Sequence, residues 1–173
     1  TAGHINPAIA IAKTIKEKEP LSEILFVGNK TGLEQRLVKN AGFQIKSVSI
    51  SGFKRSLSPS AIVHNVKTAA RAVSASSKAS RIIKEFKPDI CIGTGGYVSG
   101  PVIRAAQKLN IPTLVHEQNA FPGVTNKMLS KKAKRVMLAV EAAGKHFDGS
   151  PEFVLTGNPI RPEVLRVNSE EAK

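Results

Sequence analysis

The chain has 173 residues, with 26 Lys and Arg against 13 Asp and Glu, so its formal net charge is +13. This length suits one domain, and the single cysteine excludes an internal disulfide and a zinc site built from cysteines. No apolar run is long enough to span a membrane and no secretory signal pattern opens the sequence, so we expect a cytoplasmic protein. The positive charge leaves nucleic acid, an anionic membrane surface or a phosphorylated substrate as partners.

The first half of the chain alternates helical and extended patterns. Asn6 is expected to cap a first helix, which Pro7 opens and Pro20 ends. The next segments are predicted, in chain order, as a strand over 24–27, a helix over 33–40, a strand over 43–50 and a long helix over about 59–86.

The second half continues this alternation. Its predicted segments are a strand over 90–92, a helix that Pro101 opens and that ends near 109, strands over 112–115, 135–139 and 153–155, and a helix over 124–130. Short apolar strands separated by helices are typical of a parallel sheet covered on both faces, so the sequence predicts an α/β fold. Residues 1–160 are expected to form this domain, and the polar tail 161–173 to begin a linker.

Three segments of unusual composition are expected beyond the carboxyl ends of the strands, where such sheets bind ligands. The first, residues 1–4, leads into a helix N-terminus, whose free N–H groups and dipole favour anions. A loop of this kind needs a supporting strand, which we expect to be missing ahead of Thr1; the competing interpretation is a frayed terminus. His4 is the candidate for proton transfer because imidazole titrates near neutral pH, with a packing role as the alternative.

The second segment, residues 93–100, is rich in glycine and precedes a predicted helix. Val98 stands where the dinucleotide fingerprint G-x-G-x-x-G has its last glycine, and no Lys-Ser/Thr pair of the Walker type follows. Binding of a pyrophosphate or of a diphosphate sugar is predicted, with a tight strand-to-helix turn as the alternative.

The third segment, residues 116–119, places the polar side chains of His, Glu, Gln and Asn in succession at a strand end. Such amide and carboxylate groups suit the recognition of sugar hydroxyls. A metal site is the competing interpretation, and it is disfavoured because adjacent side chains on an extended backbone point in opposite directions.

Basic residues gather between positions 52 and 87, where eight Lys and Arg accompany one acidic residue, Glu85. On a helix, several of them lie within about 80° of one another and beside an apolar stripe, which suits an anionic membrane surface. The alternative is a stripe that packs on the sheet. Nucleic acid is disfavoured because aromatic residues make up only 5% of the chain. The predicted membrane-facing residues are Ile62, Val66, Lys67, Arg71, Val73, Lys78 and Arg81.

An ordered set of motifs runs through essentially all 173 residues. Its members are Gly3-His4 followed by Asn6-Pro7-Ala8, then Gly95-Gly96-Tyr97-Val98-Ser99-Gly100-Pro101, His116-Glu117-Gln118-Asn119 and Gly157-Asn158-Pro159-Ile160-Arg161. Together they resemble the MurG family of peptidoglycan N-acetylglucosaminyltransferases, although Ala2 stands where many members have Gly.

The resemblance implies the N-terminal, acceptor-binding half of a GT-B glycosyltransferase: a Rossmann-like, doubly wound parallel sheet whose first strand is missing and whose donor half is absent. The full enzyme would transfer GlcNAc from UDP-GlcNAc to the MurNAc 4-hydroxyl of lipid I, undecaprenyl-pyrophosphoryl-MurNAc-pentapeptide, with inversion, at the cytoplasmic face of the bacterial membrane. No cofactor and no obligatory metal are expected, since there is no Asp-x-Asp motif, and the fragment alone is expected to be inactive.

Two alternatives to this enzyme half stay open. The chain would be either a stand-alone acceptor-binding subunit of a two-part GlcNAc transferase, or a non-enzymatic basic module that binds lipid or nucleic acid.

The same resemblance implies roles for individual residues. His4 would act as general base or orient the acceptor, and Arg161 would approach the UDP phosphates. The other implied roles are UDP-GlcNAc binding for Thr1, Ala2, Gly3 and Asn119, and acceptor or diphosphate binding for Gly95, Gly96, Tyr97, Glu117 and Gln118.

Overall fold

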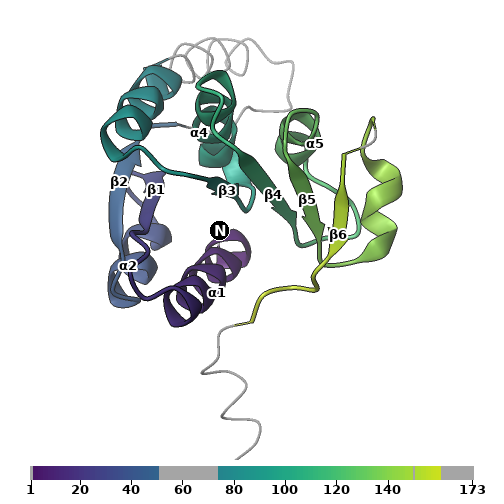
Figure 1. Ribbon diagram of the computed structural model, residues 1–173, viewed down its shortest axis with the longest axis horizontal. Helices are drawn as coiled ribbons and strands as arrows, with labels where there is room; N and C mark the ends of the chain where they lie inside the picture. The colour runs from purple at the N-terminus through teal and green to yellow at the C-terminus, as the bar shows by residue number, and fades with distance from the viewer. Residues whose placement is uncertain (1, 51–73, 150, 161–173) are drawn as a thin grey trace, which may run out of the picture.

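The computed structural model describes residues 2–50, 74–149 and 151–160 (Figure 1). The strands in this part of the chain are β1 (Leu25–Asn29), β2 (Gln44–Val48), β3 (Cys91–Gly93), β4 (Thr113–Glu117), β5 (Arg135–Leu138) and β6 (Phe153–Leu155). The helices are α1 (Ala2–Lys18), α2 (Leu33–Asn40), α4 (Gly96–Lys108), α5 (Val124–Ser130), the 3₁₀ helix η1 (Glu141–His146) and the helical residues 74–86.

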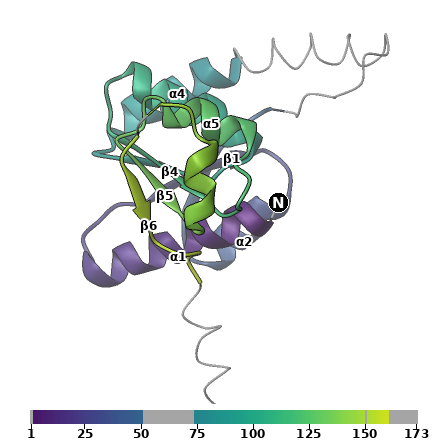
Figure 2. The same cartoon turned by 90° about the vertical axis from the view of Figure 1, so that its right-hand side faces the viewer.

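Every strand pair among the described residues is parallel. β1 pairs with β2, and a separate sheet has the order β3-β4-β5-β6. In Figure 1 the strands follow one another as β2, β1, β3, β4, β5 and β6, so the chain moves outward in both directions from a point between β1 and β3. Helices α1 and α2 cover one face, while residues 74–86, α4 and α5 cover the other (Figures 1 and 2). The doubly wound parallel α/β fold is therefore confirmed, and ligands of such folds bind where the strand order reverses.

The two sheets share one hydrophobic core. Val48 of β2, Ile82 of the helical residues 74–86 and Ala106 of α4 are buried together, and Leu25 of β1 and Cys91 of β3 pack against them. Helix α4 contacts β1, β3 and β4, so it bridges the sheets. Within the described residues, neither the edge of β1 remote from β2 nor the edge of β3 remote from β4 forms a ladder with another strand.

Two helices begin earlier than predicted, and the expected cap at Asn6 is wrong. Helix α1 begins at Ala2 and α4 at Gly96, so Pro7 and Pro101 are each the sixth residue of a helix. A proline at that position removes one backbone hydrogen bond, to a carbonyl in the first turn, and leaves the rest of the helix intact. Tertiary contacts of the first turns, described below, hold them helical.

Strand β4 is longer than predicted, because His116 and Glu117 continue the ladder opposite Met137 and Leu138 of β5. The polar segment 116–119 is thus split: its first two residues lie in the strand and its last two follow it. This extension decides which side chains are buried in the candidate site.

Candidate functional site

The three segments singled out in the sequence meet at the carboxyl ends of β3 and β4. His4 lies in the first turn of α1 and its Nδ1 is 3.1 Å from Oε1 of Gln118. The same ring lies against the glycine-rich turn: a Cβ built on Gly95 would be 2.9 Å from Cε1 and Nδ1 of His4, and one built on Gly96 would be 3.5 Å from Cδ2. Residues more than 90 positions apart in the sequence therefore form one cluster.

Gly95 meets two separate requirements. Its φ of 98° lies in the left-handed region that favours glycine, and the His4 ring occupies the place where a side chain would stand. Gly96 has a φ of 81° and opens α4 directly. This turn therefore lets α4 begin beside the imidazole.

The N-termini of α1 and α4 come together at the contact between His4 and Gly95. The first turn of neither helix contains an acidic residue. Free N–H groups and positive helix ends attract anions, and two such ends without an acidic residue in either first turn suit a ligand with several negative charges. Tyr97, in the first turn of α4, is 64% exposed and flanks this position.

Glu117 is buried by the same extension of β4 and is 1% exposed. Its Oε1 accepts hydrogen bonds from the backbone N and Nδ2 of Asn119, both at 3.0 Å. Its Oε2 accepts from the N of Gly123 at 3.1 Å and from Nδ2 of Asn126 at 2.8 Å. The carboxylate thus holds the segment between β4 and α5 in place. A sugar-binding side chain would be exposed, whereas this carboxylate is buried and both of its oxygens accept from protein donors.

His116 is fully buried beneath the site. Its Nε2 lies 3.1 Å from the carbonyl of Gly157, and its Nδ1 lies 2.9 Å from Nε2 of Gln118. Burial lowers the pKa of His116, and the Gly157 hydrogen bond opposes that effect only in part. The imidazole is accordingly neutral near pH 7 and connects the segment after β6 to Gln118.

The remaining predicted residues lie in different places. Asn119 is exposed, and its amide nitrogen is held by Glu117. Ala2 and Gly3 form the first turn of α1 and are exposed. Five of the predicted membrane-facing residues and two of the predicted substrate-binding residues fall outside the described residues: Ile62, Val66, Lys67, Arg71, Val73, Thr1 and Arg161.

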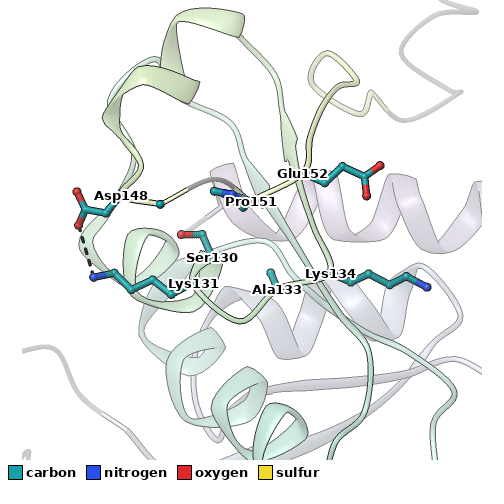
Figure 3. A pocket seen from close by; sticks show the side chains of 8 residues that line it. Ser130, Lys131, Ala133, Lys134, Asp148, Pro151 and Glu152 are labelled. Atoms are coloured by element: carbon teal, nitrogen blue, oxygen red, sulfur yellow. Dashed lines mark ion pairs between the residues drawn. The ribbon is translucent and has the colours of Figure 1, made fainter.

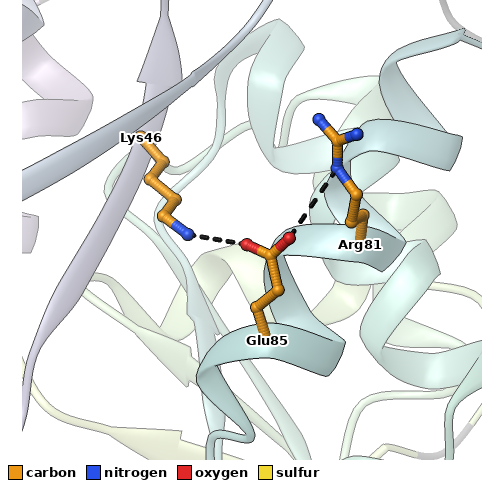
Figure 4. A network of polar contacts seen from close by, with 3 residues as sticks. All are labelled: Lys46, Arg81 and Glu85. Carbon is orange, nitrogen blue, oxygen red and sulfur yellow. Dashed lines mark hydrogen bonds and ion pairs between the residues drawn. The ribbon is translucent and has the colours of Figure 1, made fainter.

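Lys78 and Arg81 are exposed, as a membrane-facing role requires. Glu85 offsets part of the charge of Arg81, since its carboxylate lies 3.9 Å from Nε of Arg81, and it also lies 2.8 Å from Nζ of Lys46 (Figure 4). Lys46 lowers the pKa of Glu85, mainly through its hydrogen bond. Exposed ion pairs of this kind contribute little to stability.

A shallow depression of about 550 Å³ lies elsewhere, between the end of α5 and the segment before β6 (Figure 3). Basic and acidic side chains line it together, and Lys131 is 3.5 Å from Asp148 across it. Its lining includes none of the residues around His4.

Comparisons with known proteins identify the family of the chain. A model of the glycosyltransferase family 28 N-terminal domain matches residues 1–138. The chain belongs to glycosyltransferase family 28.

Individual family 28 relatives match the whole chain. A protein of Acetivibrio thermocellus, named UDP-N-acetylglucosamine--N-acetylmuramyl-(pentapeptide) pyrophosphoryl-undecaprenol N-acetylglucosamine transferase, is 54% identical over 173 residues, which are 100% of this chain and 46% of the relative. A protein of the same name from Thermoanaerobacter sp. is 52% identical over 171 residues, 99% of this chain and 46% of that protein. The crystal structure of Acinetobacter baumannii MurG matches with a TM-score of 0.74 at 34% identity, over 91% of this chain and 43% of that one. The chain thus spans about half the length of its family 28 relatives.

Sequence reasoning missed the buried partners in the site. Asn126, 2% exposed, also donates to the carbonyl of His116 at 3.2 Å, and Gly157 takes part through its carbonyl alone. Every residue has a backbone carbonyl, so the residue type does not indicate which carbonyl accepts a hydrogen bond in the site. The available signal was Asn126 itself, an amide in the first turn of α5 on the same face as Leu129 and Ser130, since a buried amide needs partners.

Proposed function

We propose that the chain is the acceptor-binding half of an inverting glycosyltransferase that transfers GlcNAc from UDP-GlcNAc to the MurNAc 4-hydroxyl of lipid I, giving lipid II. The observation that carries the proposal is the meeting of His4 with two helix N-termini whose first turns contain no acidic residue. That arrangement provides a base beside an anion site, in a chain similar to relatives whose name specifies this transfer.

The reaction would proceed as a single displacement. Nε2 of His4 accepts the proton of the acceptor 4-hydroxyl while that oxygen attacks C1 of GlcNAc from the face opposite UDP. The new C1–O bond forms as the bond from C1 to the phosphate oxygen breaks, and UDP leaves with the bonding electrons. One displacement inverts the configuration, so no covalent nucleophile is required.

The charged parts of both substrates would be held by the surrounding chain. The start of α4, at Gly95, Gly96 and Tyr97, would hold the acceptor diphosphate, and the start of α1 would lie beside the donor. Asn119 presents its Oδ1 at the exposed edge and would contact a sugar hydroxyl. Arg161 and Thr1 would approach the donor, as the resemblance implies.

The geometry changes the proposed roles of two residues. Glu117 and Gln118 would hold other residues of the site in place and would not touch the substrates. Protein donors occupy both oxygens of Glu117, and the amide of Gln118 faces His4 and His116. Sugar contacts are thereby left to the exposed side chains around them. Within the described residues no group of three or more His, Cys, Asp and Glu is placed to hold a metal ion.

A transfer assay tests the proposed function. The full-length protein that carries this sequence is expected to convert lipid I and radiolabelled UDP-GlcNAc into lipid II, while residues 1–173 alone yield no labelled product. Transfer that requires a separately added donor-binding protein would support the two-part enzyme instead. Failure to label lipid I with an intact, folded full-length protein would contradict the proposal.

We further propose that the face around α5 lies on an anionic membrane. Phe121 is 77% and Val124 81% exposed, Met128 lies one turn further, and Lys127 and Lys131 accompany them. Apolar side chains beside lysines favour an anionic bilayer surface, where each nearby Lys or Arg contributes about 1 kcal/mol. No helix in the described part of the chain is long and apolar enough to cross a bilayer.

Vesicle binding tests this membrane face. The Phe121→Ser/Val124→Ser double variant is expected to bind phosphatidylglycerol vesicles about tenfold more weakly, which corresponds to about 1.4 kcal/mol. Leu21→Ser is the matched control, since Leu21 is 97% exposed but lies between α1 and β1. Equal losses in both variants, or tighter binding to RNA than to vesicles at the same salt, would contradict the assignment.

A further inference from the structure

We propose that Gln118 is a positioning residue that fixes the His4 imidazole as its Nδ1–H tautomer, so that Nε2 is the basic nitrogen. The hydrogen-bond chain runs from the carbonyl of Gly157 through His116 and Gln118 to His4. The role of His4 in catalysis rests on the proposed function, but the tautomer itself does not.

The orientation of the Gln118 amide follows from hydrogen-bond partners that can only accept. The carbonyl of Thr94 can only accept, and it lies 3.0 Å from Nε2 of Gln118, so this atom is the amide NH₂ group. Oε1 is then the atom that faces His4, and it can only accept. Nδ1 of His4 must therefore carry the proton.

His116 completes the argument from the other side. The Gly157 carbonyl also can only accept, so Nε2 of His116 carries a proton and donates to it at 3.1 Å. Because burial keeps His116 neutral, its Nδ1 has a free lone pair and accepts the second hydrogen of the Gln118 amide at 2.9 Å. Nε2 of Gln118 also lies 3.2 Å from the carbonyl of His116, so its two hydrogens face three acceptors, and rotating the amide would place an oxygen against all three.

The consequence lies at the outer edge of the His4 ring. In neutral imidazole one nitrogen carries the proton and the other keeps its lone pair. With Nδ1 protonated, Nε2 of His4 keeps its lone pair, and no other described residue forms a hydrogen bond with it. Without the amide, the ring is free to place its proton on either nitrogen, and one of the two tautomers cannot act as a base at Nε2.

The test measures the tautomer directly. The ¹⁵N chemical shifts of the histidine rings are measured in the labelled full-length protein at a pH where the rings are neutral. His4 is expected to show a pyrrole-type shift for Nδ1 and a pyridine-type shift for Nε2. In Gln118→Leu the two shifts are expected to move toward each other as both tautomers become populated. Gln118→Glu keeps an acceptor toward Nδ1 but sets its second oxygen against the carbonyl of Thr94, so its shifts are expected to lie between those of Gln118→Leu and the wild type.

Gln107→Leu is the matched control. Gln107 also uses its amide to hold α4, through Thr113 and the carbonyl of Leu129, but it does not touch His4. The His4 signals are expected to be unchanged in this variant. A pyridine-type Nδ1 in the wild type, or a Gln118→Leu spectrum identical to it, would overturn the proposal.

Activity separates this inference from the proposed function. Gln118→Leu is expected to lower kcat by about 10²-fold, because a wrongly protonated base cannot accept the hydroxyl proton. KM for UDP-GlcNAc is expected to stay near its wild-type value. A shifted tautomer with unchanged kcat would remove His4 from proton transfer and leave the positioning role of Gln118 standing.

Discussion

Replacing His4 with alanine in the full-length protein is expected to lower kcat for GlcNAc transfer by about 10²- to 10⁴-fold, the contribution of a positioned general base. UDP-GlcNAc affinity is expected to change little, because the donor would be held by backbone groups and by the other half of the enzyme. Steady-state kinetics with lipid I, together with calorimetric titration of UDP-GlcNAc, measures the two effects separately.

The control for this prediction is His146→Ala. His146 lies in η1 with its ring 5.0 Å from that of Phe121, and it takes no part in the hydrogen bonds of Gln118 or His4. Its loss is expected to leave kcat near wild type. A His4→Ala enzyme with full turnover would contradict the assignment of His4 as base, whereas a joint loss of kcat and donor affinity would assign it to donor binding.

The second large effect is expected at Glu117. In Glu117→Gln one carboxylate oxygen becomes an NH₂ group that faces donors, which should destabilise the fold by about 2–4 kcal/mol. For a domain of this size the apparent Tm would fall by roughly 4–16 °C. Thermal unfolding monitored by circular dichroism measures this loss, and transfer assays well below the Tm measure what activity is left.

Glu141→Gln is the control for charge alone, because Glu141 is exposed in the first turn of η1. It is expected to leave the Tm nearly unchanged. If Glu117 instead contacted a sugar, Glu117→Gln would keep its Tm and lose acceptor affinity, and that result would return Glu117 to the substrate-binding residues.

The alternation of elements could be predicted from the sequence because it depends on local pattern. Short apolar runs bounded by glycine and proline marked the strands, and β6 (Phe153–Leu155) and α2 (Leu33–Asn40) have the predicted bounds. The two helix starts were predicted too late, at Pro7 and Pro101, because proline is common at a first helical position. What holds the preceding turns helical is tertiary, such as the contact of His4 with Gly95, and no local rule contains it.

The candidate site could be predicted as a set of segments but not as a set of roles. The sequence placed His4, the glycine-rich turn and the polar segment at strand ends, and the structure brings them together. It gave no means of seeing that His116 and Glu117 continue a strand whose two faces are both covered, which buries them. The division between residues that touch a substrate and residues that hold others in place depends on that burial.

The unpaired edges of β1 and β3 have a practical consequence for work with residues 1–173 alone. Backbone N–H and C=O groups on these edges have no strand partner among the described residues, although both strands cover one shared core. In Figure 1 the two edges face each other within the sheet, and unpaired strand edges are templates for pairing with another strand. The isolated domain should therefore be prepared dilute and monitored for self-association, because an oligomer joined through these edges would lie next to His4 and would mask the surface under study.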